Sequence, residues 1–291
     1  MTGVGGAERA FAGGGVFLPF YLPLEGVFGM TVAVITGAAG GIGAGLAREA
    51  ARRGMQVVLA DRDEAALQEV ARGIGNAAYA VQTDVTDPAS LEALADKAYK
   101  AHGQVDLLFN NAGVLATGNS WEIPVEKWQQ SWAVNVDGIL NGLRAFVPRL
   151  LAADRPARII NTASVGGFLP SPLMAPYSAT KFATVALTES LAGELAMLGS
   201  KIAVSLLAPG PVKSGIFRDT PGQQAEGFHN TMIDMLEQNG MTGDQFAPLV
   251  LDAIERGEYW IFPQPEALEP TFSNRNQAIV ERKAPQFFTV D

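Results

Sequence analysis

The sequence predicts an α/β fold in which one doubly wound parallel sheet of about seven strands forms a single domain. Short β-branched, apolar runs alternate with helical patterns between residues 31 and 262, as expected of successive βα units. The first run, at residues 31–36, is followed at once by the glycine-rich turn GAAGGIG and a helical pattern. The chain has 291 residues, 48% of them hydrophobic, so it is long enough to bury one large core.

Composition excludes several classes of function. The 30 acidic residues outnumber the 21 basic ones, giving a net charge of −9, and an acidic surface repels the phosphate backbone of nucleic acids. The chain has no cysteine and only two histidines, His102 and His229. Disulfides and thiolate sites are therefore ruled out, and a metal site would have to be built almost wholly from carboxylates. We therefore expect neither nucleic acid nor a metal ion as a partner.

Residues 1–29 differ from the rest of the chain. They are glycine-rich, and prolines 19 and 23 interrupt their apolar patch at residues 17–24. A membrane span needs about 20 uninterrupted apolar residues, and a secretory signal needs a basic start and a cleavage site that this stretch does not offer clearly. We expect a mobile N-terminal extension, no membrane partner and a cytoplasmic location. Met30 is an alternative natural start.

The glycine turn after the first strand has the pattern of a phosphate-binding turn. Gly37 permits the tight turn, Gly41 lets the backbone approach a pyrophosphate, and Gly43 lets helix and strand pack closely. The N-terminus of the helix expected at residues 44–53 then faces the negative charge. A glycine-rich turn without a ligand is the alternative, but the strand-turn-helix context favours binding.

The residue after the second strand, expected at residues 56–60, bears on cofactor choice. Asp61 stands about 20 positions beyond the glycine turn, where an acidic residue bonds the ribose hydroxyls of a dinucleotide. A carboxylate there repels a 2′-phosphate, which favours NAD over NADP. Arg62 argues in the opposite direction, and we give Asp61 the greater weight.

Helices and strands alternate through the middle of the chain. We expect a helix at 63–74, a strand at 77–83, a helix at 87–101, a strand at 105–109, a mostly helical stretch at 122–151 and a strand at 158–162. Gly75, the pair Asp87-Pro88 and Pro148 mark ends of these helices. Asp84 and Val85 follow a strand, where a carboxylate either touches an adenine amino group or serves as a turn residue.

The last third of the chain contains the expected substrate lid. We expect a helix at 179–198, a strand at 201–207, a lid at 213–240, a helix at 241–256 and a strand at 258–262. The lid is polar with scattered large apolar residues, which suits closure over a substrate and equally suits an ordinary amphipathic helix. His229 is expected at its surface. Pro263 and Pro265 prevent regular continuation, so residues 30–265 form the domain, and the tail at 266–291 packs across a partner subunit or is mobile.

A serine, a tyrosine and a lysine in the segment 164–181 are candidates for catalysis. Tyr177 and Lys181 are four residues apart, so they share one face of a helix, and an ammonium near a phenol favours the ionised form. This would lower a pKa that is ordinarily near 10 toward the range of a general base. Ser164 follows a strand, where its hydroxyl can polarise a substrate carbonyl. Alone, a tyrosine and lysine at this spacing are a common accident.

Five motifs in register resolve that ambiguity. TGAAGGIG, NNAG (residues 110–113), Ser164, YSATK (177–181) and PGPVKS (209–214) occur in one order at compatible spacings. Over residues 31–262 the chain resembles the short-chain dehydrogenase/reductase family. The resemblance implies a Rossmann-type sheet, a nicotinamide cofactor, a small-molecule alcohol or ketone substrate and a homotetramer or homodimer.

The resemblance also implies roles for individual residues. The catalytic residues would be Asn135, Ser164, Tyr177 and Lys181, with Asn135 holding a water that relays protons to Lys181. The cofactor-binding residues would be Gly37, Gly41, Ile42, Gly43, Asp61, Arg62, Asp84, Val85, Asn111, Ala112, Gly113, Tyr177, Lys181, Pro209, Gly210, Val212 and Ser214. Val212 would bond the carboxamide through its backbone. An interhelical hydrogen bond is the structural alternative for Asn135.

The sequence therefore predicts an NAD-dependent enzyme that interconverts a secondary alcohol and a ketone. Apolar residues including Phe168, Met174 and Phe217 suggest a bulky hydrophobic or aromatic substrate. The runs VPRLLAADRPARIINTASVGG and GMTGDQFAPLVLDAIERGEYWIFPQPE look like those of family members that oxidise benzylic alcohols of lignin-derived biaryls. The alternatives are an NADP-preferring carbonyl reductase and a non-catalytic NAD-binding regulator.

Overall fold

The computed structural model describes residues 31–285 and 287. The extension expected at residues 1–29, the alternative start at Met30 and the last residues of the tail lie outside the described residues.

Within the described residues, seven strands form one sheet in the order β3-β2-β1-β4-β5-β6-β7. They are β1 (Val32–Thr36), β2 (Gln56–Asp61), β3 (Ala78–Gln82), β4 (Leu107–Asn110), β5 (Ala157–Thr162), β6 (Ile202–Leu207) and β7 (Trp260–Ile261). Every pair of neighbours is parallel. The chain winds outward from β1 to β3 and then from β4 to β7 in the other direction, which is the doubly wound arrangement that the sequence predicts.

Helices connect the strands and extend beyond them. They are α1 (Gly41–Arg52), α2 (Glu64–Ile74), α3 (Pro88–His102), α4 (Val125–Trp132), α5 (Gly138–Ala153), α6 (Ala175–Met197), α7 (Glu226–Asn239), α8 (Gly243–Glu255) and α9 (Thr271–Val280). The short 3₁₀ turns are η3 (Val165–Gly167), η4 (Gly215–Phe217), η5 (Gln223–Ala225) and η6 (Pro265–Ala267), and a π-turn, η2 (Ala133–Asp137), joins α4 to α5.

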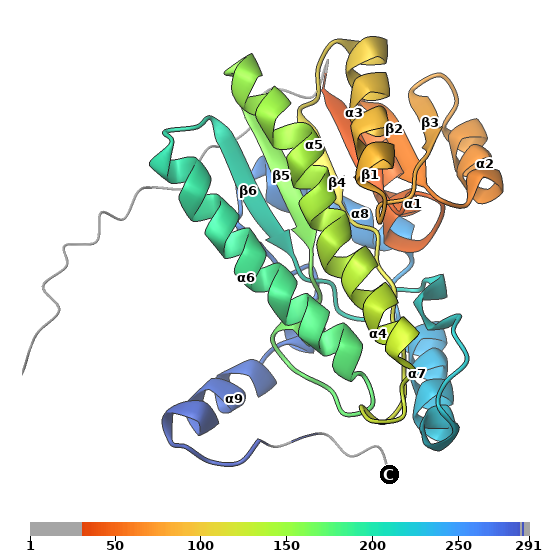
Figure 1. Cartoon of the computed structure of the whole chain (residues 1–291), viewed down its shortest axis with the longest axis vertical. Coiled ribbons are helices and arrows are strands. Elements are labelled where there is room, and N and C mark those ends of the chain that lie inside the picture. The colour runs from red at the N-terminus through yellow and green to blue at the C-terminus, as the bar shows by residue number, and fades with distance from the viewer. Residues whose placement is uncertain (1–30, 286, 288–291) are drawn as a thin grey trace, which may run out of the picture.

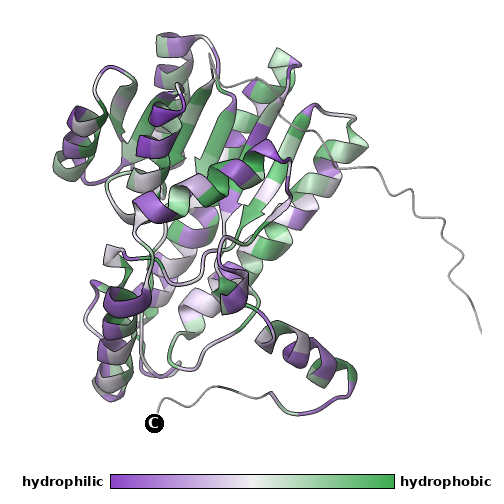
Figure 2. Ribbon diagram, turned by 180° about the vertical axis from the view of Figure 1, so that it is seen from behind, coloured by the Kyte–Doolittle hydropathy of each residue, from purple (hydrophilic) through white to green (hydrophobic). Residues whose placement is uncertain are grey.

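The helices cover both faces of the sheet. One buried apolar cluster joins the sheet to α1, α2 and α8, and a second joins it to α3, α5 and α6 on the opposite face, as Figure 1 shows. The strands are hydrophobic along most of their length (Figure 2), which is typical of parallel strands buried on both faces. The helices α7 and α9 project from the lower end of the molecule in Figure 1.

The helices α1 and α8 cross at two glycines. A Cβ atom on Gly45 would lie 2.3 Å from the carbonyl carbon of Gly243, and one on Gly243 would lie 2.2 Å from the Gly41 oxygen, so neither position has room for a side chain. Arg53 adds ion pairs to Asp252 at 2.6 Å and Glu255 at 2.6 Å in α8. The N-terminus of α1, which follows the glycine turn, is thereby fixed against α8.

Two expectations about proline were wrong. Pro148 does not end its helix, because α5 continues to Ala153; Pro148 is exposed there, and its fixed φ suits a helix. Regular structure also continues past Pro263, since η6 and α9 follow. Pro265 begins η6, where the missing N–H has no helical partner. The tail therefore contains a helix, whose Arg275 guanidinium lies 5.2 Å from the Phe182 ring centroid in α6.

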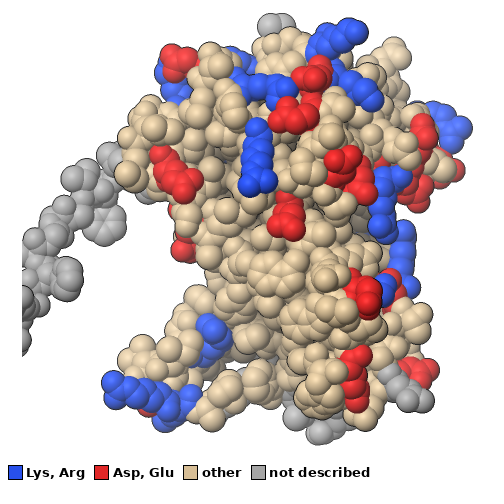
Figure 3. All heavy atoms as spheres, viewed as in Figure 1, with Lys and Arg blue, Asp and Glu red and all other residues tan. Residues whose placement is uncertain are grey.

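The surface carries both signs of charge. On the face drawn in Figure 3, acidic and basic side chains are interspersed, with no broad patch of one sign. Among the described residues, no helix combines the length and the apolar character needed to cross a membrane.

Candidate active site

The predicted site residues lie where the strands end. Because all seven strands are parallel, their carboxyl ends share one edge of the sheet. The glycine turn follows β1, Asp61 ends β2, residues 84–85 follow β3, residues 111–113 follow β4, Ser164 follows β5 and residues 209–214 follow β6. This edge is where open α/β sheets bind their ligands.

The glycine turn is suited to hold a pyrophosphate. Gly37 and Gly41 have φ angles of +69° and +53°, which glycine adopts most readily. A Cβ on Gly43 would lie 2.1 Å from the Gly37 oxygen. No side chain caps the N-terminus of α1, so the amides of its first turn are available to an anion. Ile42, in that turn, packs against the core.

The turn after β6 approaches the same helix end. A Cβ on Gly41 would lie 2.8 Å from the Ser214 Cβ, so Ser214 borders the phosphate turn. Val212 is buried and forms an isolated bridge with Met241. The residues of both turns therefore fit a dinucleotide that runs from the end of β1 toward the end of β6.

Gln264 fixes the 209–214 turn, although no sequence motif singles it out. Its Oε1 accepts from the Gly210 amide at 3.1 Å, and its Nε2 donates to the Pro211 oxygen at 2.9 Å. In the sequence, Gln264 stands between Pro263 and Pro265, where regular structure was expected to end. In the structure its side chain is buried. The Pro209 oxygen accepts from the Val165 amide at 3.0 Å, which ties this turn to the segment after β5.

Asp61 is held in position at the end of β2. One carboxylate oxygen accepts from the Ala39 amide at 3.1 Å, and the other accepts from the Asp63 amide at 3.1 Å. The first bond connects the carboxylate to the glycine turn, as expected of a ribose-binding acid. Arg62 is exposed beside it.

Asp84 closes its own turn. Its carboxylate accepts from the Thr86 amide at 2.9 Å and from the Thr86 hydroxyl at 2.8 Å, which is the turn role left open in the sequence. Val85 and Ala112 instead line a small hollow beside Thr36, Asn110 and η2.

Thr36 fixes the segment after β4, a role that sequence reasoning missed. Its hydroxyl accepts from the Asn111 amide at 2.9 Å and the Ala112 amide at 3.2 Å, while the Asn111 side chain donates to the Thr36 carbonyl at 3.0 Å. The only sequence signal was a threonine directly before the glycine turn. The 111–113 segment is therefore bonded to the end of β1.

Asn135 lies fully buried in the π-turn η2. Its amide nitrogen donates to the Val114 oxygen at 3.0 Å and the Thr180 hydroxyl at 2.9 Å, and its Oδ1 accepts from the Val114 amide at 2.8 Å. The Thr184 hydroxyl donates to the backbone oxygen of Asn135 at 3.3 Å. The side chain thus makes the interhelical bond proposed as the structural alternative. Single π-turns inside α-helices often lie at functional sites.

Ser164, Tyr177 and Lys181 lie together and are all buried. Lys181 Nζ lies 5.6 Å from the Tyr177 ring centroid and donates to the Thr162 oxygen at 2.8 Å. The Ser164 oxygen accepts from the Gly166 amide at 3.1 Å. A Cβ on Gly113 would lie 3.5 Å from Asn135 Oδ1 and 3.6 Å from Lys181 Nζ, so the fourth predicted residue borders the same space.

Burial dominates the protonation of this group. It raises the pKa of Tyr177, although the hydrogen bond with Ser164 lowers it. Burial lowers the pKa of Lys181 from 10.5 to about 8, because the ammonium has left water. The sequence-based expectation of a lowered tyrosine pKa was therefore wrong for the protein alone, since desolvation of the phenol outweighs its polar contacts.

The apolar wall beside Tyr177 combines two separate segments. Leu115, Met174 and Tyr177 form a buried cluster, against which Ile216, Phe217 and Phe228 of the predicted lid pack. Met174 and Phe217 thus both pack in the cluster that contains Tyr177.

Phe168 lies elsewhere. Its ring makes edge contacts with Trp260, Phe262 and Phe272, at centroid distances of 5.9, 5.5 and 5.5 Å. Phe168 therefore belongs to a cluster that holds the C-terminal segment, and we remove it from the predicted pocket.

The lid packs closely against the body. Lys127 and Asp219 form an ion pair at 2.7 Å, and the Asn119 side chain donates to Gln224 at 2.9 Å. His229 is buried at 6% exposure, so the expectation of a surface histidine was wrong. Its ring faces Thr117 and Phe217 rather than solvent.

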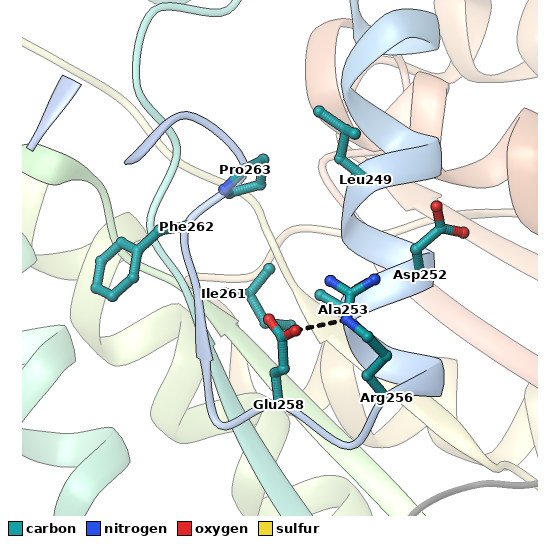
Figure 4. A pocket seen from close by; sticks show the side chains of 8 residues that line it. All are labelled: Leu249, Asp252, Ala253, Arg256, Glu258, Ile261, Phe262 and Pro263. Carbon is teal, nitrogen blue, oxygen red and sulfur yellow. Dashed lines mark hydrogen bonds and ion pairs between the residues drawn. The ribbon is translucent and has the colours of Figure 1, made fainter. Parts of the chain in front are cut away.

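A separate pocket lies between α8 and the segment around β7 (Figure 4). Leu249, Ile261 and Phe262 line it together with an Arg256–Glu258 ion pair at 2.6 Å, and it includes none of the predicted site residues. The described part of the chain contains no group of three potential metal-ligating side chains.

Comparisons with known proteins identify the family of the chain. A family model of the short chain dehydrogenases matches residues 31–225. The chain is 36% identical to a 1-deoxy-11-beta-hydroxypentalenate dehydrogenase of Streptomyces exfoliatus, over 81% of this chain and 83% of that protein. It is 33% identical to a C alpha-dehydrogenase of Sphingobium sp. strain SYK-6, over 87% of each chain.

A solved structure of a relative extends the match to the whole domain. A short chain dehydrogenase/reductase from Burkholderia phymatum, in complex with NAD, is 35% identical, with a TM-score of 0.87 over 91% of this chain and 99% of that one. The chain therefore belongs to the short-chain dehydrogenase/reductase family.

Proposed function

We propose that the protein is an NAD-dependent dehydrogenase that interconverts a secondary alcohol and its ketone, acting on a bulky hydrophobic or aromatic substrate. The observation that carries the proposal is the buried group of Ser164, Tyr177 and Lys181. It lies at the same sheet edge as the glycine turn and the 209–214 turn. A non-catalytic NAD-binding protein would have no need of this group.

The reacting oxygen would lie between two hydroxyls. Ser164 and Tyr177 are hydrogen-bonded to each other, so one substrate oxygen can contact both. Ser164 would hold that oxygen, and Tyr177 would take its proton during oxidation or return it during reduction. The bound nicotinamide supplies the hydride chemistry, whereas the chain supplies orientation and electrostatics.

Lys181 would stabilise the ionised form of Tyr177. With a pKa of about 8, the ammonium is mostly charged at neutral pH, and its charge 5.6 Å from the Tyr177 ring favours the phenolate. The same ammonium would bond the nicotinamide ribose. Asn135 would complete the proton path, since its Oδ1 and Lys181 Nζ border the same space beside Gly113.

The contacts of Asp61 favour NAD. Its carboxylate is fixed by two backbone amides and keeps further lone pairs for the two ribose hydroxyls. A 2′-phosphate at this position would meet a fixed negative charge, which would offset any attraction to Arg62.

The substrate class follows from the pocket wall. Leu115, Met174 and Phe217 pack in one apolar cluster with Tyr177, so the group attached to the carbinol would be apolar and large. The resemblance of two sequence runs to enzymes that oxidise benzylic alcohols of lignin-derived biaryls supports an aryl secondary alcohol, and a C alpha-dehydrogenase is among the relatives.

A panel of aryl and aliphatic secondary alcohols, assayed with NAD and NADP in parallel, tests the proposal. We expect reduction of NAD with aryl alcohols at a higher kcat/KM than with aliphatic ones, and a lower kcat/KM with NADP. Equal inertness toward all alcohols, with NAD binding retained, would contradict catalysis. Preference for NADP would contradict only the role of Asp61.

A further inference from the structure

The lid contains a buried imidazole that the proposed reaction does not use. His229 in α7 is 6% exposed, and Leu236 is the other residue that α7 buries. Buried polar side chains need a hydrogen-bonding partner. His229 has one, because its Nδ1 lies 3.0 Å from the hydroxyl oxygen of Thr117.

Backbone hydrogen bonds tie Thr117 and its neighbour Gly118 to two other segments. Its carbonyl accepts from the Gly222 amide of the lid at 3.0 Å, and the next residue, Gly118, donates its amide to the Leu173 oxygen at 2.9 Å. Thr117 is itself buried at 5% exposure. The hydroxyl therefore meets the imidazole from a fixed position, which orients the ring.

This contact engages Nδ1 and leaves Nε2 as the ring nitrogen that can bind a further partner. His229 Nδ1 is the only hydrogen-bond partner of the Thr117 hydroxyl among the described residues. In the tautomer in which the Thr117 hydroxyl donates to Nδ1, Nε2 carries the proton and is a hydrogen-bond donor. Unlike Nε2 of His102, Nε2 of His229 is not among the fully buried polar atoms without a partner.

The imidazole adjoins the apolar wall beside Tyr177. Its ring meets the Phe217 ring edge-on, with 5.5 Å between centroids and 80° between planes. Phe217 packs against the cluster of Leu115, Met174 and Tyr177. The chain itself makes the same connection. Thr117 is two residues beyond Leu115, and the residue that Gly118 bonds, Leu173, directly precedes Met174. These contacts thus place the imidazole of His229 next to the apolar cluster beside Tyr177.

We propose that His229, oriented by Thr117, forms a polar subsite that binds a hydrogen-bond-accepting oxygen of the substrate. The oxygen would be an ether, carbonyl or carboxylate oxygen on the group attached to the carbinol carbon. This inference rests on the proposed function. A single donor among apolar side chains discriminates between substrates, because a substrate without the acceptor oxygen leaves the donor without a hydrogen bond.

Pairs of substrates equal in size isolate the subsite. The probes are 1-(methoxyphenyl)ethanols and 1-(ethylphenyl)ethanols, each as the ortho, meta and para isomer, assayed with NAD. The readout is the ratio of kcat/KM for a methoxy alcohol to that for its ethyl counterpart. We expect the ratio to reach about five to ten for at least one isomer, as one neutral hydrogen bond provides.

Four variants separate the subsite from a structural role. His229→Phe and Thr117→Val should bring the ratio to about one, and His229→Gln, which keeps a donor, should restore part of it. Thr231→Val removes the hydroxyl of an exposed threonine in the same helix and should leave the ratio unchanged. Thermal unfolding of each variant shows whether the lid stays folded.

Each result decides the proposal. A wild-type ratio near one for all three isomers, or a ratio preserved in His229→Phe, would overturn the subsite. If His229 only fastened the lid, its replacement would lower kcat/KM for both members of a pair alike and leave the ratio unchanged, which would also overturn the subsite. Turnover of none of the alcohols by the wild type would instead contradict the proposed function, and the subsite with it.

Discussion

The burial of Lys181 predicts that the protein becomes more stable when this lysine is removed. Lys181 is 3% exposed and its pKa is lowered from 10.5 to about 8, which corresponds to a cost of about 3 kcal/mol for the charged form in the folded state. Lys181→Met removes that cost and loses the hydrogen bond to the Thr162 oxygen, worth about 1 kcal/mol. The net gain at pH 7 is therefore about 2 kcal/mol.

The pH dependence has a definite sign. Below pH 8 both the folded and the unfolded wild type hold the lysine proton, so the folded state bears the full cost. Between the folded pKa of about 8 and the ordinary value of 10.5, the unfolded chain keeps a proton that the folded chain has released. Wild-type stability rises with pH across this window. The advantage of Lys181→Met should therefore shrink from pH 8 toward pH 10.5.

Thermal unfolding measures both effects. At pH 7 the variant should unfold about 4–8 °C above the wild type, although it should be inactive. A Tyr177→Phe background prevents the neighbouring phenol from titrating. Lys201→Met is the control, because the Lys201 side chain is 52% exposed and paired with Asp154 at 3.0 Å, and its effect should be small and independent of pH. A Lys181→Met variant that is less stable at pH 7, or whose advantage does not change with pH, would refute the reasoning.

Three further predictions test the cofactor site, the positioning of Asn135 and the fold. Asp61→Ala removes the carboxylate that would bond the ribose and should raise the NADP-to-NAD ratio of kcat/KM at least about tenfold; an unchanged ratio would exclude Asp61 as the selective residue. Thr184→Val removes a hydroxyl bonded to the Asn135 oxygen at 3.3 Å and should lower kcat about tenfold with little change in KM, whereas Thr184→Ser should recover activity; equal losses in both variants would indicate a packing effect. Gly45→Ala places a Cβ 2.3 Å from the Gly243 backbone and should destabilise the protein by more than about 3 kcal/mol. The control Gly193→Ala, on an open helix surface, should stabilise the protein by up to about 1 kcal/mol. Similar denaturation midpoints for the two variants would contradict the close crossing of α1 and α8.

The features that the sequence predicted depend on local patterns. A β-branched run followed by glycines determines where β1 ends and where α1 begins, since both follow from residues adjacent in the chain. Tyr177 and Lys181 share a helix face because of their spacing alone. Asp61 was placed by its distance along the chain from the glycine turn, and two backbone amides now fix it there.

What the sequence missed depends on partners far away in the chain. Gln264 bonds a turn more than fifty residues before it, and His229 bonds Thr117, which is 112 residues away. Spacing does not reveal such pairs. Phe168 was assigned by its nearness to Ser164 in the chain, but its ring turns toward the C-terminal segment. The tyrosine pKa was misjudged because burial of the phenol is a property of the folded chain.

The role of the threonines in α6 could be predicted only in part from the sequence. Thr180, Thr184 and Thr188 recur every fourth residue and are all fully buried. That spacing is visible in the sequence, and it indicates one polar stripe on an apolar helix. Only the structure shows that the stripe meets Asn135 through Thr180 and Thr184, which makes it a support for the candidate active site.

The most direct test of the central claim compares the wild type with Tyr177→Phe, using the secondary alcohol that the wild type oxidises fastest. Removing one hydroxyl should lower kcat/KM by at least about a thousandfold, while NAD binds with unchanged affinity in a calorimetric titration. Turnover that survives this substitution would contradict the assignment of Tyr177 as the group that exchanges the proton of the alcohol.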